Sequence, residues 1–293
     1  MRVLVTGANG FLGRHVARVL GEGGLEVTGF DLHADATTGV RSVVGDICDF
    51  TQIRQASVGK DVICHVAAIG DVYLAAKDPP LASRVNVTGS ANVAEAAVAN
   101  GCKVVYASTW EVYGQPQYEP IDEKHPTAPD HPYNITKLAG ERLLLAADHL
   151  RGVPVVALRL GTAYGTGLRP NSVFSLFIDQ ARRGEPITIQ GDGSQRRQFT
   201  HASDLAKAFL LACQSDVHGQ PFNTIAPEQI SIKDLAELVI RRLPTELVYA
   251  EARFGDIPSG QLSADAIKRV LGWEPETSFE SGLNALIDTT LRV

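Results

Sequence analysis

The feature that most constrains the fold of this chain is a short apolar run that leads directly into three evenly spaced glycines. RVLVTG at residues 2–7 has the composition of a buried strand, and Gly7, Gly10 and Gly13 follow before a helix-like stretch. In this context the first glycine allows a tight turn, the second lets the backbone approach a pyrophosphate, and the third permits close packing of helix on strand. The sequence therefore predicts a dinucleotide-binding turn. A glycine turn that serves geometry alone is the alternative.

The first half of the chain goes on alternating apolar strand-like runs with helix-like stretches. This alternation is typical of βαβ units and a parallel sheet. Strand-like runs are EVTGFDL, DVICHVAA, KVVYAS and VPVVALRL; helix-like stretches cover residues 51–57, residues 83–101 up to Gly101, and the residues after Tyr133. We expect an α/β fold, with a Rossmann-type doubly wound parallel sheet and a smaller α/β C-terminal substrate lobe.

From Thr166 onward the pattern loosens into polar, glycine-rich loops between shorter elements. This change favours a substrate-binding lobe in the second half. We predict an NAD-binding domain at residues 1–165, to which residues 199–226 return, and a nucleotide-sugar-binding lobe made of residues 166–198 and 227–293. No internal repeat and no low-complexity segment interrupts the chain.

The composition bears on which partners the protein can bind and where in the cell it is expected. The formal net charge is -6 and no basic run occurs, which argues against nucleic acid because phosphate backbones are held by clustered Lys and Arg. The four cysteines are scattered singly, without metal-ligand spacing, so we expect no metal site. Met1 leads straight into an apolar strand without a signal sequence or a membrane span, so a cytoplasmic protein is expected.

Asp31 ends the second expected strand in TGFDLH. A carboxylate there accepts hydrogen bonds from the adenosine ribose and repels a 2′-phosphate, so NAD is favoured over NADP. An aspartate that only caps a turn is the alternative. Asp46 and Ile47, in GDICD after the third expected strand, are candidates to contact the edge of the adenine ring.

Tyr133 and Lys137 stand four residues apart in YNITK. On a helix these positions share a face, so the Lys137 ammonium can favour the phenolate of Tyr133. A free phenol has a pKa of about 10, and nearby positive charge is needed to make it a base near neutral pH. The pair predicts an acid–base role, although the same spacing also occurs on solvated helix faces.

Together these segments resemble the extended short-chain dehydrogenase/reductases, in the branch of nucleotide-sugar epimerases, dehydratases and decarboxylases, with UDP-glucose 4-epimerase as the type. The likeness covers nearly the whole chain and rests on VTGANGFLG, GDICD, HVAA, NVTGS, STWEVYG, YNITK, LRLGTAYG, GDGSQRRQF and LGWEP. It implies a Rossmann domain that holds NAD, a lobe that grips a nucleoside diphosphate sugar, and a homodimer built on two paired helices.

The resemblance also implies roles for single residues. Thr109 matches the Ser or Thr that hydrogen-bonds the sugar hydroxyl being oxidised, Tyr133 the catalytic base and Lys137 its partner. Further cofactor contacts fall on Asn9, Phe11, Leu12, Ala67, Ala68 and Asn86, with Lys137. Substrate contacts fall on Thr109, Tyr133, Thr162, Arg197 and Arg253, where the two arginines suit a diphosphate. For Arg196, Arg197 and Arg253 a surface salt bridge is the alternative.

Two residues bear on the reaction that follows oxidation at C4. Glu111 matches a carboxylate that dehydratases and decarboxylases of the family use near C5, or it is a structural acceptor. Trp110 replaces an acidic residue of glucose-type dehydratases, and an indole has no proton of suitable acidity. Thr162 stands where the family usually has an Asn, so the motif does not determine which sugar is bound.

We therefore expect an NAD-dependent UDP-hexose 4-epimerase. A 4,6-dehydratase or UDP-glucuronate decarboxylase that uses Glu111 is the alternative. Two further readings remain: a reductase that releases its cofactor at each turnover, and a regulator that binds NAD without catalysis.

Overall fold

The computed structural model describes residues 1–34, 39–251 and 260–292, and its centre is a seven-stranded parallel sheet. The strand order is β11-β6-β5-β4-β1-β2-β3, with every neighbouring pair parallel. The strands are β1 (Arg2–Thr6), β2 (Glu26–Asp31), β3 (Arg41–Val44), β4 (Val62–His65), β5 (Lys103–Thr109), β6 (Val155–Leu160) and β11 (Gln220–Thr224). This order is that of a doubly wound sheet, so the expected fold class is confirmed.

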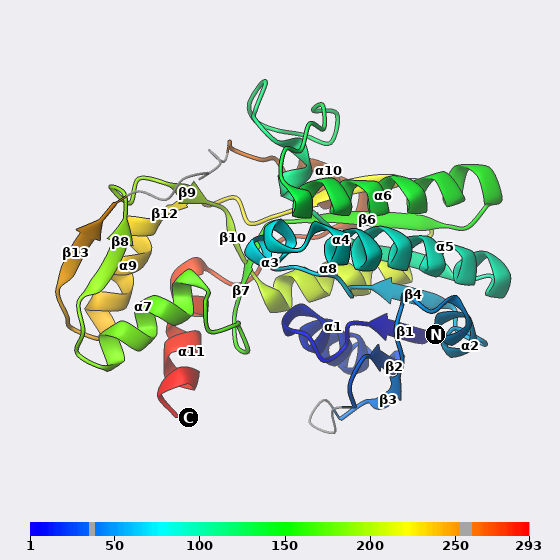
Figure 1. Ribbon diagram of the computed structural model, residues 1–293, viewed down its shortest axis with the longest axis horizontal. Coiled ribbons are helices and arrows are strands. Elements are labelled where there is room, and N and C mark those ends of the chain that lie inside the picture. Colours follow the sequence, from blue (N-terminus) through cyan, green and yellow to red (C-terminus); the bar gives the residue numbers. More distant parts are fainter. Residues whose placement is uncertain (35–38, 252–259, 293) are drawn as a thin grey trace.

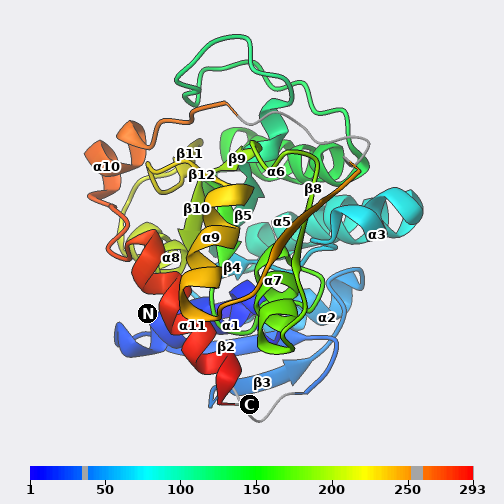
Figure 2. The ribbon, with the colours of Figure 1, turned by 90° about the vertical axis from the view of Figure 1, so that its left-hand side faces the viewer.

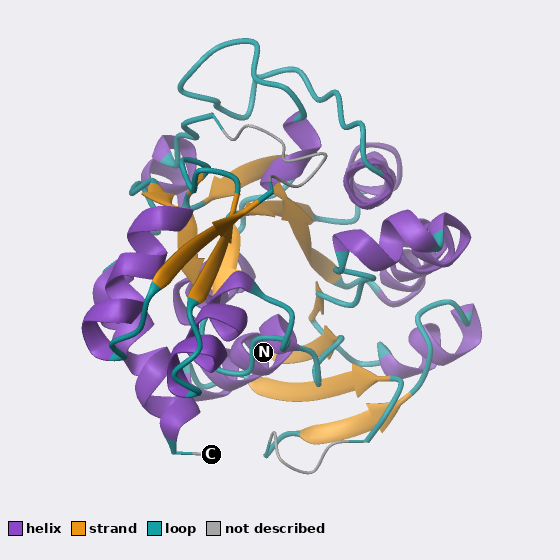
Figure 3. Ribbon diagram, turned by 60° about the vertical axis from the view of Figure 1, so that its left-hand side comes forward, coloured by secondary structure: helices purple, strands orange, loops and turns teal. Residues whose placement is uncertain are grey.

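Helices cover both faces of this sheet, as Figure 3 shows. The helical elements of this region are α1 (Phe11–Glu22), α2 (Phe50–Ala56), α3 (Val72–Lys77), α4 (Pro79–Ser83), the π-helical turn η2 (Arg84–Thr88), α5 (Gly89–Asn100), the 3₁₀ turn η3 (Trp110–Tyr113), α6 (Pro132–Arg151), α8 (Ala202–Gln214) and α10 (Asp265–Leu271). Alternation along the strands divides the core: Val3 and Val5 pack with α1 and α8, whereas Leu4 packs with α2, α5 and α6.

The remaining elements form a lobe at one end of the molecule (Figures 1 and 2). They are α7 (Val173–Arg182), β8 (Ile187–Gln190), β9 (Arg196–Arg197), β12 (Ile230–Ser231), α9 (Ile232–Arg242), β13 (Leu247–Ala250) and α11 (Phe279–Leu291), with β7 (Thr162–Tyr164) and β10 (Phe199–His201) at the junction. An apolar cluster of its own holds the lobe, and Tyr164 stacks on Phe174 there with ring centroids 5.1 Å apart.

The residue boundaries of the two regions stay a prediction. In the expected lobe segment 227–293, α11 packs in the lobe cluster. Ile267 of α10 and Trp273, however, are buried with α1 and α8 against the main sheet, and the Trp273 indole donates to the Asp204 carbonyl at 2.8 Å. The chain therefore returns to the main sheet between the two parts of the lobe.

Candidate functional site

The glycine turn lies where β1 ends and α1 begins, beside the turn that follows β4. Gly7 has a φ of +68°, and its N–H donates to the Phe30 carbonyl at 2.8 Å. A Cβ on Gly7 would stand 2.7 Å from Ala67 Cα, and one on Gly13 would stand 1.9 Å from the Gly7 carbonyl oxygen. Only glycine fits at either position, because the obstacle in both cases is backbone.

The amino end of α1 is open to an anion. Its N-cap is Gly10, and no side chain caps the helix, so first-turn amides remain available to phosphate oxygens. The Asp31 carboxylate lies beside this turn and accepts the Asn9 N–H at 2.9 Å. Bare helix amides with a carboxylate at the adjoining strand end fit a dinucleotide whose ribose carries no 2′-phosphate. The residues present therefore fit NAD.

A buried polar chain, which sequence reasoning missed, supports this turn from behind. Thr6 Oγ1 lies 2.8 Å from His65 Nδ1, and His65 Nε2 lies 3.1 Å from Ser90 Oγ, which donates to the Asn86 carbonyl. Burial, and then the charge of Lys137, lower the pKa of His65 to about 3, so the ring is neutral. Its position at a strand end in HVAA was the available signal.

Three of the expected cofactor residues already have structural contacts. The Asn86 side chain accepts the Ile69 N–H at 2.8 Å and donates to Thr136 Oγ1 at 3.0 Å. Asp46 Oδ1 accepts the Cys48 N–H at 2.8 Å, and Ile47 is buried in the core. Their contacts to a cofactor stay predictions.

Thr109 and Tyr133 meet at the carboxyl edge of the sheet. Thr109 ends β5 and is 6% exposed, while Tyr133 lies in the first turn of α6. Burial raises the pKa of Tyr133, and the negative charge of Glu111 adds to this rise. A hydrogen bond from Thr109 and the charge of Arg169 act in the opposite direction. The expected pair is thus brought together, and its environment by itself does not favour the phenolate.

Lys137 lies one turn further along α6 and is 2% exposed. Its Nζ stands 4.2 Å from the centroid of the Tyr106 ring, and within the described residues it has no hydrogen bond or ion pair. Burial lowers the pKa of Lys137 to about 7, although the charge of Glu141 opposes this. A buried ammonium without such a partner indicates a site that a polar ligand completes.

Glu111 lies in η3, two residues after Thr109, and is close enough to Tyr133 for its charge to act on the phenol. Burial raises the pKa of its carboxyl to about 7, against the charges of Arg197 and Arg169. Arg169 was not among the expected site residues, since only the folded chain brings it near Glu111 and Tyr133. Trp110 instead lies in an apolar cluster and is 7% exposed.

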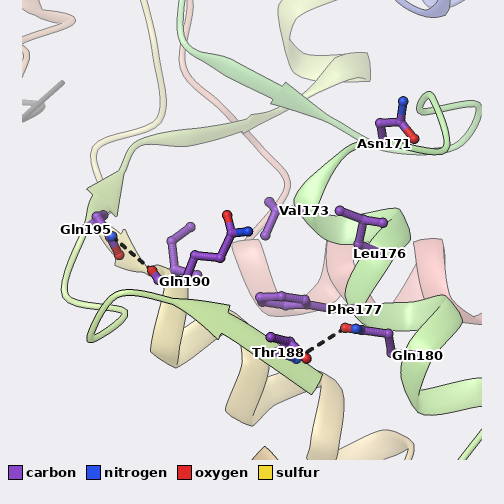
Figure 4. Close-up of a pocket in the computed structure, with 9 residues that line it drawn as sticks. Asn171, Val173, Leu176, Phe177, Gln180, Thr188, Gln190 and Gln195 are labelled. Carbon is purple, nitrogen blue, oxygen red and sulfur yellow. Dashed lines mark hydrogen bonds between the residues drawn. The ribbon is translucent and has the colours of Figure 1, made fainter. Parts of the chain in front are cut away.

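The lobe contains a cavity of about 470 Å³ between α7 and β8 (Figure 4). Its lining combines apolar and amide side chains: Asn171, Val173, Leu176, Phe177, Gln180, Thr188, Gln190, Gln195 and Ile232. In Figure 4 the Gln190 side chain extends toward Val173, with the Phe177 ring beside it. Flat apolar surface with amide donors and acceptors suits a nucleobase.

The expected substrate residues outside this cavity are distributed over the junction. Thr162 begins β7, and Arg197 lies in β9 with Nη1 2.8 Å from the Arg196 carbonyl, while Arg196 Nη1 lies 3.2 Å from the Gln229 carbonyl. Arg253 lies outside the described residues. Among the described residues no metal-ligand group of three or more gathers, and no helix is long and apolar enough to cross a membrane.

The strand order, together with a glycine turn that leads into the uncapped amino end of α1, defines a dinucleotide-binding protein of the doubly wound class. More particularly, the chain belongs to the NAD dependent epimerase/dehydratase family, whose model matches residues 3–225. It is therefore an NAD-dependent enzyme of the nucleotide-sugar epimerase, dehydratase and decarboxylase group, as the resemblance implied.

Relatives with different reactions match equally well. A UDP-glucose 4-epimerase of Mycolicibacterium smegmatis is 31% identical over 98% of both chains, and a dTDP-glucose 4,6-dehydratase of Streptomyces niveus is 30% identical over 97% of this chain and 90% of its own. The solved structure of MoeE5 in complex with UDP-glucuronic acid and NAD aligns with a TM-score of 0.92 at 33% identity, covering 100% of this chain and 99% of that one. Sequence identity alone therefore does not distinguish epimerisation from dehydration or decarboxylation.

Proposed function

We propose that this chain is an NAD-dependent nucleotide-sugar 4-epimerase of the UDP-hexose class. The observation that carries the proposal is the hydrogen bond between the Thr109 and Tyr133 hydroxyls, with the buried Lys137 one turn further along α6. A hydroxyl donor and a phenol that share one substrate oxygen can hold and remove its proton. No further acid or base is needed for epimerisation, since the same groups return the proton.

In this mechanism Thr109 orients the C4 hydroxyl and Tyr133 takes its proton. NAD, when bound, supplies the hydride acceptor and donor. Gly7, Gly10 and the first turn of α1 would hold its pyrophosphate, and Asp31 would hold its adenosine ribose. Lys137 would hold the second ribose and would also stabilise the negative charge of the Tyr133 phenolate. Rotation of the keto sugar in the site, so that its other face is presented for reduction, would give the C4 epimer.

The cavity between α7 and β8 is the proposed binding site for the nucleotide part of the substrate. Phe177 and Gln190 provide a flat apolar surface and an amide for the base, and Arg197 lies on the strand next to this region to meet the diphosphate. Arg253 is proposed for the same diphosphate from sequence alone. These features support a nucleoside diphosphate sugar as the substrate. A second copy of the chain, in a homodimer, is proposed as the protein partner.

Glu111 favours a second candidate, a 4,6-dehydratase or a decarboxylase. A carboxyl whose pKa is raised to about 7 next to Tyr133 suits proton transfer at C5. The buried Trp110 argues against the dehydratase branch, because no acid stands there to protonate a leaving hydroxyl.

Proton NMR of the purified protein without added cofactor tests these alternatives. The substrates are UDP-glucose, UDP-galactose, UDP-glucuronic acid and dTDP-glucose, so that neutral and anionic sugars are both offered to a site flanked by Arg169 and Arg197. The C4 epimer is the expected product. A 4-keto-6-deoxy sugar or a pentose would instead assign the second candidate.

A further inference from the structure

The carboxylate of Glu141 lies at the centre of a buried polar cluster beneath the site. Ser108 Oγ donates to Oε2 at 2.6 Å, and Arg159 donates to Oε2 through Nε at 3.1 Å and to Oε1 through Nη2 at 2.6 Å. Glu141 is 0% exposed, Arg159 2% and Ser108 3%. Three donors converge on one buried carboxylate, so its negative charge is fixed in place.

This cluster connects the segments that carry the proposed catalytic groups. Ser108 precedes Thr109 on β5, and Glu141 follows Lys137 by one turn of α6. Arg159 also donates to the Tyr113 hydroxyl at 2.9 Å, and Tyr113 ends the η3 turn that contains Glu111. A single carboxylate therefore links the strand end, the helix and the turn.

Charge balance gives Glu141 a second role. The titratable groups that act on or contact Lys137 are His65 from β4, Tyr106 from β5 and Glu141 from α6 itself, and Tyr133 lies one turn earlier on the same helix. Burial holds His65 and Tyr106 neutral, and in the resting state it also holds Tyr133 neutral. Among these groups of the described structure, Glu141 alone offers a negative charge to the Lys137 ammonium.

We propose that Glu141 is a positioning residue of the reaction, which keeps Lys137 in its ammonium form and fixes the Thr109 strand end through Ser108. The inference rests on the proposed role of Lys137 beside Tyr133. Lys137 titrates in the working range because burial lowers its pKa to about 7 and Glu141 limits that fall. Removal of the negative charge lowers the pKa further, so the ammonium is lost at a lower pH.

The test is the pH profile of kcat for Glu141→Gln. We expect the alkaline limb of the profile to move to lower pH by at least about half a unit, because the amide keeps the shape of the side chain but not its charge. Glu141→Asp, which keeps the charge, should restore the limb toward that of the parent. Tyr113→Phe removes a hydrogen bond of the same cluster without changing charge, and should leave the limb in place.

A purely structural Glu141 gives a different result: a lower melting temperature and a uniform loss of kcat, with the alkaline limb where the parent has it. That result would overturn the inference. If Glu141→Gln does not fold because Arg159 is left uncompensated, the double variant Glu141→Gln/Arg159→Met removes both buried charges. Because the lost Arg159 charge acts on Lys137 in the opposite direction, the alkaline limb should move the same way but by less, and a limb at or above the parent's would overturn the inference. Absence of turnover in the parent with every sugar would instead contradict the proposed function, so the two failures are distinguishable.

Discussion

Arg169 forms an ion pair with Asp71, with Nη1 and Oδ2 2.9 Å apart, and the same Nη1 lies 3.4 Å from the Gly70 carbonyl oxygen. Three residues earlier in the same loop, the Thr166 carbonyl oxygen lies 2.9 Å from Nε2 of His15 in α1. The loop at residues 165–172 thus connects the turn after β4 with α1. Both of these regions border the place where the dinucleotide is expected to bind.

The first prediction concerns retention of the cofactor. Asp71→Asn should release bound NAD about two- to fivefold faster, because an exposed ion pair contributes up to about 1 kcal/mol to holding the loop closed. The measurement is the rate at which NAD leaves the purified protein on dilution, followed by fluorescence. Asp288→Asn breaks a comparable exposed pair, with Arg242 in the lobe, and should not change this rate. Equal rates for both variants and the parent would show that the pair does not retain the cofactor.

The second prediction tests the base. Tyr133→Phe should lower turnover by at least about 100-fold, the scale of general acid–base catalysis, while the NAD content of the purified protein stays the same. Turnover is measured by product formation in the NMR assay. Tyr249→Phe, at a residue that is 53% exposed, is the control and should be as active as the parent. Activity of Tyr133→Phe near the parent level would exclude Tyr133 as the base.

The third prediction is a pH dependence of stability that arises from Glu111. Burial raises the pKa of this carboxyl from 4.5 to about 7 in the folded protein. Between these values the folded state keeps a proton that the unfolded state has released, so the free energy of unfolding falls as the pH rises through this window. Glu111→Gln cannot ionise, so relative to the parent it should gain up to about 2 kcal/mol between pH 5 and pH 8.

Urea denaturation of the parent and of Glu111→Gln at both pH values measures this gain. Glu237→Gln, on an exposed part of α9, controls for the removal of a carboxylate. A difference in unfolding free energy between Glu111→Gln and the parent that is the same at pH 5 and pH 8 would mean that Glu111 ionises normally in the folded protein.

The fourth prediction addresses the cavity of the lobe. Gln190→Ala should weaken binding of UDP about three- to tenfold, the effect of losing one hydrogen bond between its amide and a nucleobase. Titration calorimetry with UDP measures the affinity, and the NAD content shows that the main domain is intact. Gln220→Ala, at an exposed position of β11, is the matched control. An unchanged affinity in Gln190→Ala would place the nucleobase elsewhere.

The sheet and the glycine turn could be predicted from sequence because their signals are local. Each strand and helix carries its own apolar pattern, Gly7, Gly10 and Gly13 lie within seven consecutive residues, and Tyr133 and Lys137 lie on one helix. The pairs Arg159–Glu141 and Arg169–Asp71 were missed, since strand order and loop path decide which charges meet. The cavity was missed for the same reason: its lining comes from α7, β8 and residues beyond both.

The last prediction concerns a homodimer. Ile135, Leu143 and Leu150 on α6 are 48%, 41% and 74% exposed, and their spacings of eight and seven residues place them along one stripe of the helix. Neighbouring α5 is tied to α6 by the Arg151–Glu95 pair at 3.1 Å, so the two helices present one surface. Such an apolar stripe suits a second copy, and light scattering should give the parent twice the chain mass of 31.4 kDa. Leu143→Lys should yield the monomer, whereas Leu291→Lys, at a similarly exposed leucine of α11, should remain dimeric. A monomeric parent would contradict the dimer, and a dimeric Leu143→Lys would place its interface on another surface.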